Sequence, residues 1–286
     1  MSEQPLENAM LSSLETVRRL DHDRLLTALL APADRRARLI ALYAFNAEIA
    51  RVRETVSEPM LGQIRLQWWR ETVESLANGE ARGHETAEAL LGAFGKSEVD
   101  APALIALIDA RERDLDDEPF ETMQDLIAYC EGTSSSLMTL AAKALSPEET
   151  QLAKEILKSA GVAFALTGLL RALPMHASQG RLYLPLDLLQ KHAVDPHQIF
   201  SGEMTEGLRA VVHEVAVEAE KYLTVSRETR PGPSRKILPA LWPASLCDLY
   251  LKKMTEPDFN PFEHTTELPA YRLQSRFLGR KLIGRF

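Results

Sequence analysis

Charged residues that could bind an anion or a metal gather first in one short segment of this 286-residue sequence. Glu48, Arg51, Arg53 and Glu54 follow the apolar residues of a predicted helix. Their spacing predicts a polar strip along that helix, either a solvated, salt-bridged face or the lining of a cavity. Inside a cavity the opposite charges would stabilise one another, because an unpaired buried charge is expensive.

Two further arginines and a tyrosine could contact an anionic ligand. Arg171 and Arg181 could bind phosphate in a two-pronged manner, or could form structural ion pairs with acids such as Asp114 or Glu54. Tyr183 could line a cavity or pack in the core. The residue types leave both interpretations open.

The candidate metal ligands and bases are isolated from one another. His176 has no second ligand at helical spacing, which favours a surface or hydrogen-bonded histidine over a metal ligand or general base. Asp114, Asp116 and Asp117 do not share one helix face, so we expect a solvated helix end there. We therefore predict no catalytic residue and no metal ligand from these patterns.

The elements that position these side chains are predicted to be helices. Apolar residues recur at helical spacing over residues 39–53, 61–76, 104–115, 123–145, 146–173, 208–225 and 271–283. The longest alternating pattern covers only residues 181–185, and the breaks at 231–233 and 256–261 are short turns. We predict an all-α fold that forms one domain over residues 1–286.

Composition sets limits on location and partners. Apolar residues make up 45% and charged residues 26%, as in a globular protein with a sizeable core. We find no apolar run of about 18 residues and no signal peptide in the polar N-terminus, and we expect a cytoplasmic protein. The two cysteines, Cys130 and Cys247, are expected to be buried thiols.

The charge is unevenly distributed. The net charge is −8, yet residues 271–286 contain five basic residues and no acid, so the rest of the chain carries −13. An acidic body disfavours nucleic acid as a partner. The basic tail favours an acidic surface, and a membrane is one candidate.

Residues 268–286 are predicted to form a basic amphipathic C-terminal helix. One side carries Arg272, Arg276, Arg280 and Lys281, and leucine, isoleucine and phenylalanine fall mostly on another side. This pattern is typical of a helix at a membrane surface or partner. The alternative is that the helix packs on the domain with its basic face in water.

Three stretches resemble the squalene/phytoene synthase family. They are residues 41–54 with 64–70, residues 126–131, and residues 166–171 with the string GRLYLP at 180–185. The resemblance implies an isoprenoid-synthase-type helical bundle around a central cavity, whose enzymes join two prenyl diphosphates head to head with magnesium. It implies, as candidates for ligand or diphosphate binding, Tyr43, Arg51, Glu54, Arg171, Arg181 and Tyr183.

The chain departs from this family at its two aspartate-rich motifs. The matching positions are Ala50 and Glu54 in the first motif, and Ala172 and His176 in the second. Alanine cannot bind a metal, and a neutral imidazole is a poor ligand for magnesium. Pro174 lies between the second pair and is predicted to interrupt the helix.

These departures resemble one branch of the family, that of the respiratory complex I assembly factor of mitochondria and its bacterial relatives. The string AFNAE at 44–48 and the string VSE at 56–58 carry this resemblance. It implies a non-catalytic role without a cofactor, in complex assembly at the inner face of the cytoplasmic membrane. The implied partners are respiratory complex subunits or assembly intermediates, the membrane surface, and a prenyl or lipid ligand.

An active enzyme is the alternative interpretation. Such a prenyltransferase would condense prenyl diphosphates with Mg²⁺ at a non-standard site, in which Glu54, Glu48 and acids around Asp114 replace the missing aspartates. The number of carboxylates that face the cavity distinguishes the two interpretations.

Overall fold

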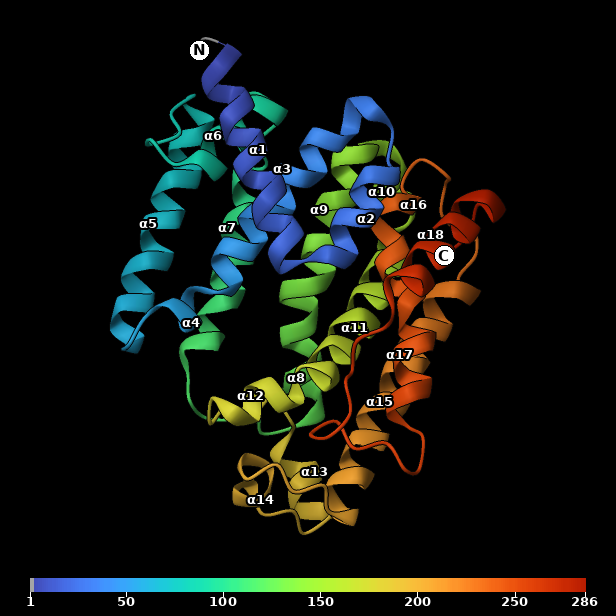
Figure 1. The fold of residues 1–286 in the computed structure, drawn as a ribbon. Helices are drawn as coiled ribbons and strands as arrows, with labels where there is room; N and C mark the ends of the chain where they lie inside the picture. The colour runs from blue at the N-terminus through green and yellow to red at the C-terminus, as the bar shows by residue number, and fades with distance from the viewer. Residues whose placement is uncertain (1–2) are drawn as a thin grey trace.

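The computed structural model describes residues 3–286, and its regular structure within that range is helical (Figure 1). The first part of the chain forms α1 (Glu3–Leu20), α2 (His22–Leu30), α3 (Ala33–Ala50), α4 (Val52–Thr55), α5 (Pro59–Ala77), α6 (Glu85–Phe94), α7 (Ala101–Arg111) and the 3₁₀ helix η1 (Glu112–Leu115). The prediction of an all-α fold is confirmed.

The remaining helices follow in two groups. The middle group is α8 (Met123–Cys130), the π-helical turn η2 (Glu131–Ser135), α9 (Ser136–Leu145), α10 (Pro147–Leu152), α11 (Lys154–Arg171), α12 (Leu173–Ser178), α13 (Leu186–Lys191) and α14 (Pro196–Phe200). The last group is α15 (Glu206–Glu228), α16 (Leu238–Leu241), the 3₁₀ helix η3 (Trp242–Leu246), α17 (Cys247–Met254) and α18 (Ala270–Ile283).

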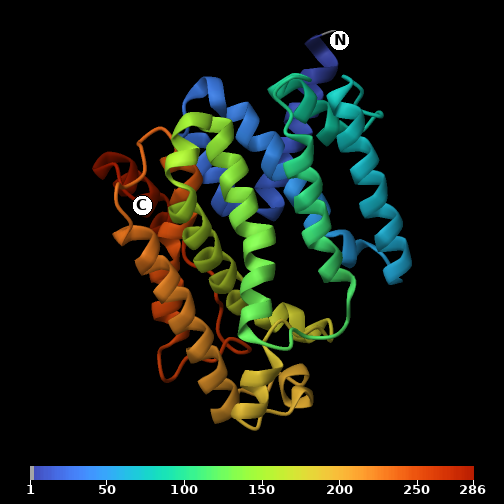
Figure 2. The same cartoon turned by 180° about the vertical axis from the view of Figure 1, so that it is seen from behind.

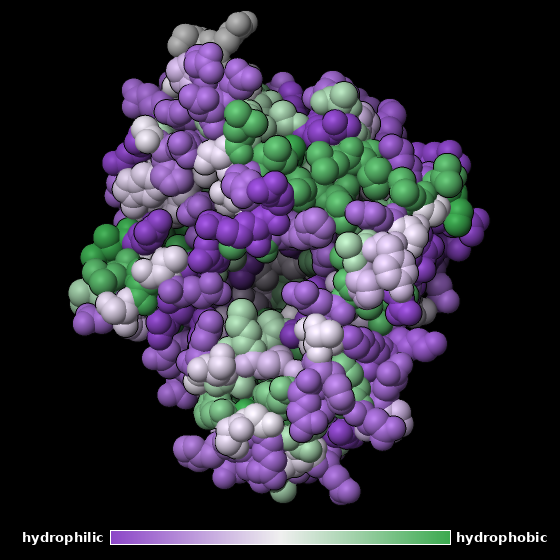
Figure 3. All heavy atoms as spheres, viewed as in Figure 1, coloured by the Kyte–Doolittle hydropathy of each residue, from purple (hydrophilic) through white to green (hydrophobic). Residues whose placement is uncertain are grey.

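Helices α11 and α15 pack along each other, and α8, α9 and α17 also pack against α11 (Figures 1 and 2). Helices α1, α3 and α6 pack together at the other side of the molecule. The buried apolar residues of all these helices form one contiguous core. The face in Figure 3 is hollowed at its centre, between α1 and α2 above and α12 below.

The predicted helix over 123–145 is present but contains the π-helical turn η2. At this turn the backbone of α11 comes close, because Gly161 has no side chain. A Cβ atom at Gly161 would lie 2.4 Å from the Ser135 Cα atom. The Ser135 hydroxyl donates a hydrogen bond of 2.7 Å to the Lys158 carbonyl. The missing side chain therefore sets how closely α11 crosses η2.

Two helix breaks occur in the region of residues 146–178, and the sequence indicates only the second. The predicted helix over 146–173 is divided at Ala153, between α10 and α11, and nothing in the local sequence explains that break. Helix α11 ends at Arg171, and Pro174 lies in the first turn of α12. The second break is the predicted one, because proline is tolerated in a first helical turn but not in a helix interior.

Cys130 and Cys247 are free, buried thiols, as predicted. Burial raises the pKa of Cys247 to about 12. Within residues 3–286, no helix has both the length and the apolar character needed to cross a bilayer.

Two glycines of α11 provide a test of this packing. Gly161→Ala should lower the free energy of unfolding by about 1–3 kcal/mol, because the new methyl group meets the backbone of Ser135. Gly168→Ala is the matched control, since a Cβ atom there meets no atom within 4 Å. It should raise stability by about 0.5–1 kcal/mol through helix propensity. Urea unfolding followed by circular dichroism measures both, and equal effects would contradict the close approach.

Candidate functional site

A buried carboxylate is the centre of the polar interior. Asp114 in η1 is only 5% exposed. Its Oδ1 atom accepts hydrogen bonds from the hydroxyls of Tyr129 at 2.6 Å and Tyr183 at 3.0 Å. Its Oδ2 atom accepts one from Arg111 at 3.2 Å. The expectation of a solvated helix end is therefore wrong for Asp114, because three partly buried hydrogen-bond partners replace the water that its charge would need.

Two more residues complete this group, which we call the Asp114 cluster: Arg111, Asp114, Tyr129, His176, Arg181 and Tyr183. One nitrogen of Arg181 donates to the Asp114 carbonyl and to the Tyr183 hydroxyl, both at 2.7 Å. The His176 ring lies 4.4 Å from the Tyr183 ring, measured between centroids. Burial, followed by the charge of Arg181, lowers the pKa of His176 to about 4. This imidazole is therefore neutral at pH 7.

The residues that resemble the first family motif lie at the end of α3 and in α4. Ala50 is the last residue of α3, and the Arg51 Nε atom lies 3.3 Å from Glu54 Oε2. Both of these charged side chains are about one-third exposed. Arg53 pairs with the exposed Asp117 at 3.0 Å. The charges of Arg51, Arg53 and Glu54 are thus matched within the chain, in partial contact with water, whereas Glu48 forms no ion pair with residues 3–286.

The second motif begins where α11 ends. Ala172 follows the last residue of α11, and Arg171 turns to Asp23 of α2 at 3.1 Å. The Arg171 guanidinium lies 3.7 Å above the centre of the Tyr250 ring. Burial raises the pKa of Asp23, and the charge of Arg171 opposes that rise. Arg171 thus forms a structural ion pair, but with an acid other than Asp114 or Glu54.

The predicted ligand-binding residues therefore fall into separate groups. Arg181 and Tyr183 meet in the Asp114 cluster, whereas Arg171 lies against α2 and Arg51 pairs with Glu54. Tyr43 is buried at 1% exposure, with the guanidinium of Arg24 5.8 Å from the centre of its ring.

Sequence reasoning missed several partners of these residues: Asp23, Arg24, Arg111, Tyr129 and Tyr250. Arg111 and Tyr129 lie in helices that the periodicity predicts, but nothing in their spacing indicates that they meet. Asp23 and Arg171 are 148 positions apart, so no local pattern links them.

The residues at the four positions that the resemblance assigns to the aspartate-rich motifs do not fit magnesium. Ala50 and Ala172 offer no ligand, Glu54 is paired with Arg51, and His176 is a buried neutral imidazole. Magnesium binds through carboxylates and phosphate oxygens in near-octahedral geometry, and one carboxylate remains at the four positions. Over residues 3–286, no group of three or more histidine, cysteine or acidic side chains is placed to hold a metal.

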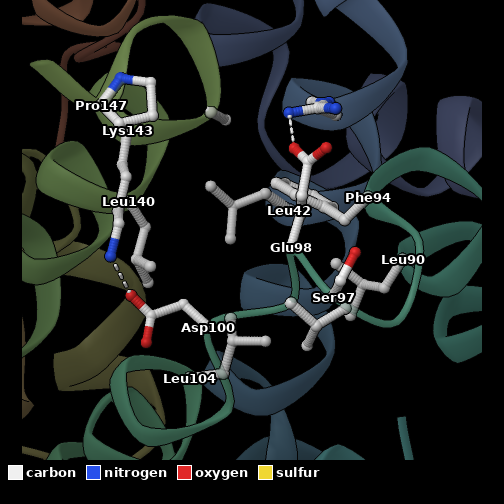
Figure 4. Close-up of a pocket in the computed structure, with 13 residues that line it drawn as sticks. Leu42, Leu90, Phe94, Ser97, Glu98, Asp100, Leu104, Leu140, Lys143 and Pro147 are labelled. Carbon is white, nitrogen blue, oxygen red and sulfur yellow. Dashed lines mark hydrogen bonds and ion pairs between the residues drawn. The ribbon is translucent and has the colours of Figure 1, made fainter. Parts of the chain in front are cut away.

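A separate cavity of about 320 Å³ lies between α3, α6, α7 and α9 (Figure 4). Two ion pairs face each other across it: Arg38 with Glu98 at 2.5 Å, and Lys143 with Asp100 at 2.6 Å. Between them the walls are apolar, formed by Leu42, Leu90, Phe94, Leu104 and Leu140. Because the charges balance, the cavity suits a small apolar group and has no preference for an anion.

The basic side chains of the C-terminal helix α18 point in different directions. Arg276 and Arg280 turn inward to Asp248 of α17, the latter at 3.8 Å. The Lys281 amine donates to the Leu30 carbonyl at 3.1 Å, and Arg272 is exposed. Part of the basic face is therefore directed at the protein, because the Asp248 carboxylate attracts it.

Comparisons with known proteins agree with this fold. The family model for squalene/phytoene synthase matches residues 17–275. NADH dehydrogenase (ubiquinone) complex I, assembly factor 6, of Bos taurus is 32% identical over 249 residues, 87% of this chain and 74% of that protein. The Homo sapiens protein of the same name is 30% identical over 263 residues, 90% and 79% of the two chains. A crystal structure of a dehydrosqualene synthase in complex with ligand has a TM-score of 0.80 at 18% identity, covering 98% of each chain.

Replacement of the central carboxylate should destabilise the protein. Asp114→Asn leaves Arg111 buried without its counter-charge, and we expect a loss of about 3–5 kcal/mol in the free energy of unfolding. Asp117→Asn is the control, since the exposed pair with Arg53 should contribute at most about 1 kcal/mol. Chemical denaturation of the two variants checks this, and a similar small loss in both would refute a central role for Asp114.

The low pKa of His176 predicts a pH dependence of stability. The ordinary value is 6.5 and the folded value is about 4, so the unfolded chain takes up this proton first as the pH falls. The contribution of the neutral imidazole to the free energy of unfolding is fully present above about pH 6.5. As the pH falls towards 4, roughly 3 kcal/mol of that contribution is lost. In His176→Gln this component should disappear. Denaturation curves across that pH range measure the difference, and identical pH slopes would exclude a titrating His176.

Proposed function

Since the chain belongs to the squalene/phytoene synthase family, we propose that it uses the family's helical fold in respiratory complex I assembly and does not transfer prenyl groups. The observation that carries this proposal is the state of the motif positions. Ala50 and Ala172 have no polar group, and the charges around them are already neutralised by partners within the chain.

The absence of prenyl transfer follows from the charge that the reaction must compensate. A diphosphate that leaves an allylic carbon carries its negative charge away, and metal ions stabilise that charge in the transition state. Here Arg171 is paired with Asp23, Arg181 serves the Asp114 cluster, and Glu54 faces Arg51. Loss of the metal clamp lowers the rate tenfold for each 1.36 kcal/mol of stabilisation that is missing.

The assembly role is supported by the relatives. The bovine and human proteins named complex I assembly factor 6 align with 87% and 90% of this chain. We propose that this chain likewise acts on respiratory complex subunits or assembly intermediates, at the inner face of the cytoplasmic membrane. A prenyl or lipid chain is the proposed ligand of the apolar cavity in Figure 4, whose volume of about 320 Å³ is at the small end for a ligand pocket.

The acids available for a substitute metal site do not favour the enzyme alternative. The Asp114 carboxylate already accepts hydrogen bonds from Arg111 and from two tyrosines. Asp116 and Asp117 are exposed and pair with Arg113 and Arg53. These positions offer an acidic surface whose charges are matched by arginine.

The first test is turnover. Purified protein with farnesyl or geranylgeranyl diphosphate, magnesium and a reductant should release no more diphosphate than a heat-treated control, and should form no C30 or C40 product. Magnesium-dependent product well above that control would overturn the proposal.

The second test separates assembly from chemistry in cells. A deletion strain should lose complex I activity and regain it with the wild-type gene. Glu54→Gln removes the last carboxylate at the motif positions and should restore activity equally well, because the proposed role uses no metal. Circular dichroism establishes that the variant is folded. Failure of a folded Glu54→Gln to complement, with wild type complementing, would point to metal-dependent chemistry.

A further inference from the structure

Four arginines line a cavity at the C-terminal end of the chain. This cavity, of about 520 Å³, is formed where α15 ends, by the loop that follows and by the end of α18. Its charged lining side chains are those of Arg227, Arg230, Arg280 and Arg285, and no aspartate or glutamate side chain of residues 3–286 lines its wall. We call it the arginine pocket.

The positive charge of the arginine pocket exceeds the nearby negative charge. Asp248 lies beside it and accepts two hydrogen bonds from Arg227, at 2.7 Å and 2.9 Å. The same carboxylate also faces Arg276 and Arg280, so one negative charge serves three arginines. Neither Arg230 nor Arg285 forms an ion pair with an acid of residues 3–286.

Several guanidinium donors in and around this pocket have no acceptor. The buried Nε atoms of Arg227 and Arg280 make no hydrogen bond within the described chain, which is also true of the Nε atoms of Arg36, Arg53, Arg111 and Arg171 elsewhere in it. One guanidinium nitrogen of Arg230 donates hydrogen bonds to the carbonyls of Arg227 and Thr229 at the end of α15. Arg230 is an exposed residue. Burial and the charges of Arg276 and Arg227 lower the pKa of Arg280. An added anion would relieve this repulsion.

An apolar surface adjoins these cations. On the outer side of α18, Leu278, Leu282 and Ile283 are 52%, 83% and 62% exposed. Lys281 lies between them and donates to the Leu30 carbonyl, which joins α18 to α2. There Leu29 is 42% exposed, and Figure 3 shows a hydrophobic band over this part of the molecule. We call Leu29, Leu278, Leu282 and Ile283 the apolar ridge.

We propose that the arginine pocket binds the phosphate group of an anionic phospholipid while the apolar ridge lies in the interface of the bilayer. Guanidinium groups bind phosphate oxygens in pairs, and several converge here around one carboxylate. Exposed leucines and isoleucine next to cations match the apolar and anionic layers of a membrane surface. A phospholipid carries a phosphate and an apolar region side by side, and it therefore matches guanidinium groups that lie next to exposed aliphatic side chains.

This inference assigns the membrane contact to a defined surface. It differs from the sequence expectation, in which the arginines of α18 face outward, because Arg276 and Arg280 are directed at Asp248. It depends on the geometry of the arginine pocket and not on the assembly role. The protein can therefore fail to bind lipid and still complement the deletion strain. It can also bind lipid and fail to complement that strain.

The test is partitioning of the purified full chain onto vesicles of phosphatidylcholine, with and without phosphatidylglycerol. We expect binding to the anionic vesicles and little to the neutral ones. Arg230→Gln with Arg285→Gln should weaken anionic-vesicle binding about 30-fold, since each arginine at an anionic surface contributes roughly fivefold. Arg18→Gln with Arg19→Gln removes the same charge from α1 and should change binding by about twofold or less.

A second pair of variants tests the apolar ridge. Leu282→Gln with Ile283→Gln should weaken anionic-vesicle binding at least about tenfold. Met60→Gln with Ile64→Gln, exposed at 67% and 61% on α5, is the matched control and should have no such effect. Circular dichroism and unfolding curves establish that all four double variants are folded. If the controls weaken binding as much as the test pairs, or if neutral and anionic vesicles bind alike, the proposal is wrong.

Titration with glycerol 3-phosphate separates a lipid headgroup from a soluble phosphate. We expect weak binding that the arginine pair reduces and the Leu282→Gln and Ile283→Gln pair leaves unchanged. Tight binding of glycerol 3-phosphate without vesicle binding would overturn the lipid assignment in favour of a soluble ligand. A dimer in light scattering that the Leu282→Gln and Ile283→Gln pair disrupts, without vesicle binding, would overturn it in favour of a second copy.

Discussion

The buried carboxylate of Asp114 sets the constraint on which this interior depends. A charge that is 5% exposed must be matched by partners, and here they come from distant segments of the chain. Arg111 comes from α7, Tyr129 from α8, and Tyr183 and Arg181 from the segment after α12. Because each partner bonds to the same residue, the relative positions of these segments are specified by hydrogen-bond geometry as well as by apolar packing.

The same constraint limits what the site can do. A cavity that binds diphosphate needs positive charge or metal that its own chain has not already neutralised. In this protein the arginines that the resemblance assigns to ligand binding are held by acids and hydroxyls of the chain. His176, at one of the four motif positions, is neutral and packed on Tyr183. The charges of the interior are thus matched by partners within the chain, although the buried Nε atoms of Arg111 and Arg171 make no hydrogen bond.

Charge that the interior does not neutralise is found at the end of α18. Asp248 pairs with Arg227, Arg276 and Arg280, and Leu278, Leu282 and Ile283 of α18 remain exposed, whereas Leu273 and Phe277 of the same helix are buried. Part of the apolar surface of this helix is therefore in water. Each Å² of apolar surface left in water forgoes about 25 cal/mol of stabilisation. Contact with a partner or a bilayer would restore it.

The sequence by itself predicted several of the long helices, since apolar spacing depends only on residues close in the chain, but α1, α2, α6 and α17 lie outside the predicted ranges. It predicted the all-α fold and the interruption at Pro174, and the second of these is a local property. Only the tertiary structure decided which charges meet. Asp23 reaches Arg171 across 148 positions, Asp114 is buried by residues from other helices, and Arg276 turns to Asp248. Electrostatic pairing depends on distances in space, and these are set by how the helices pack.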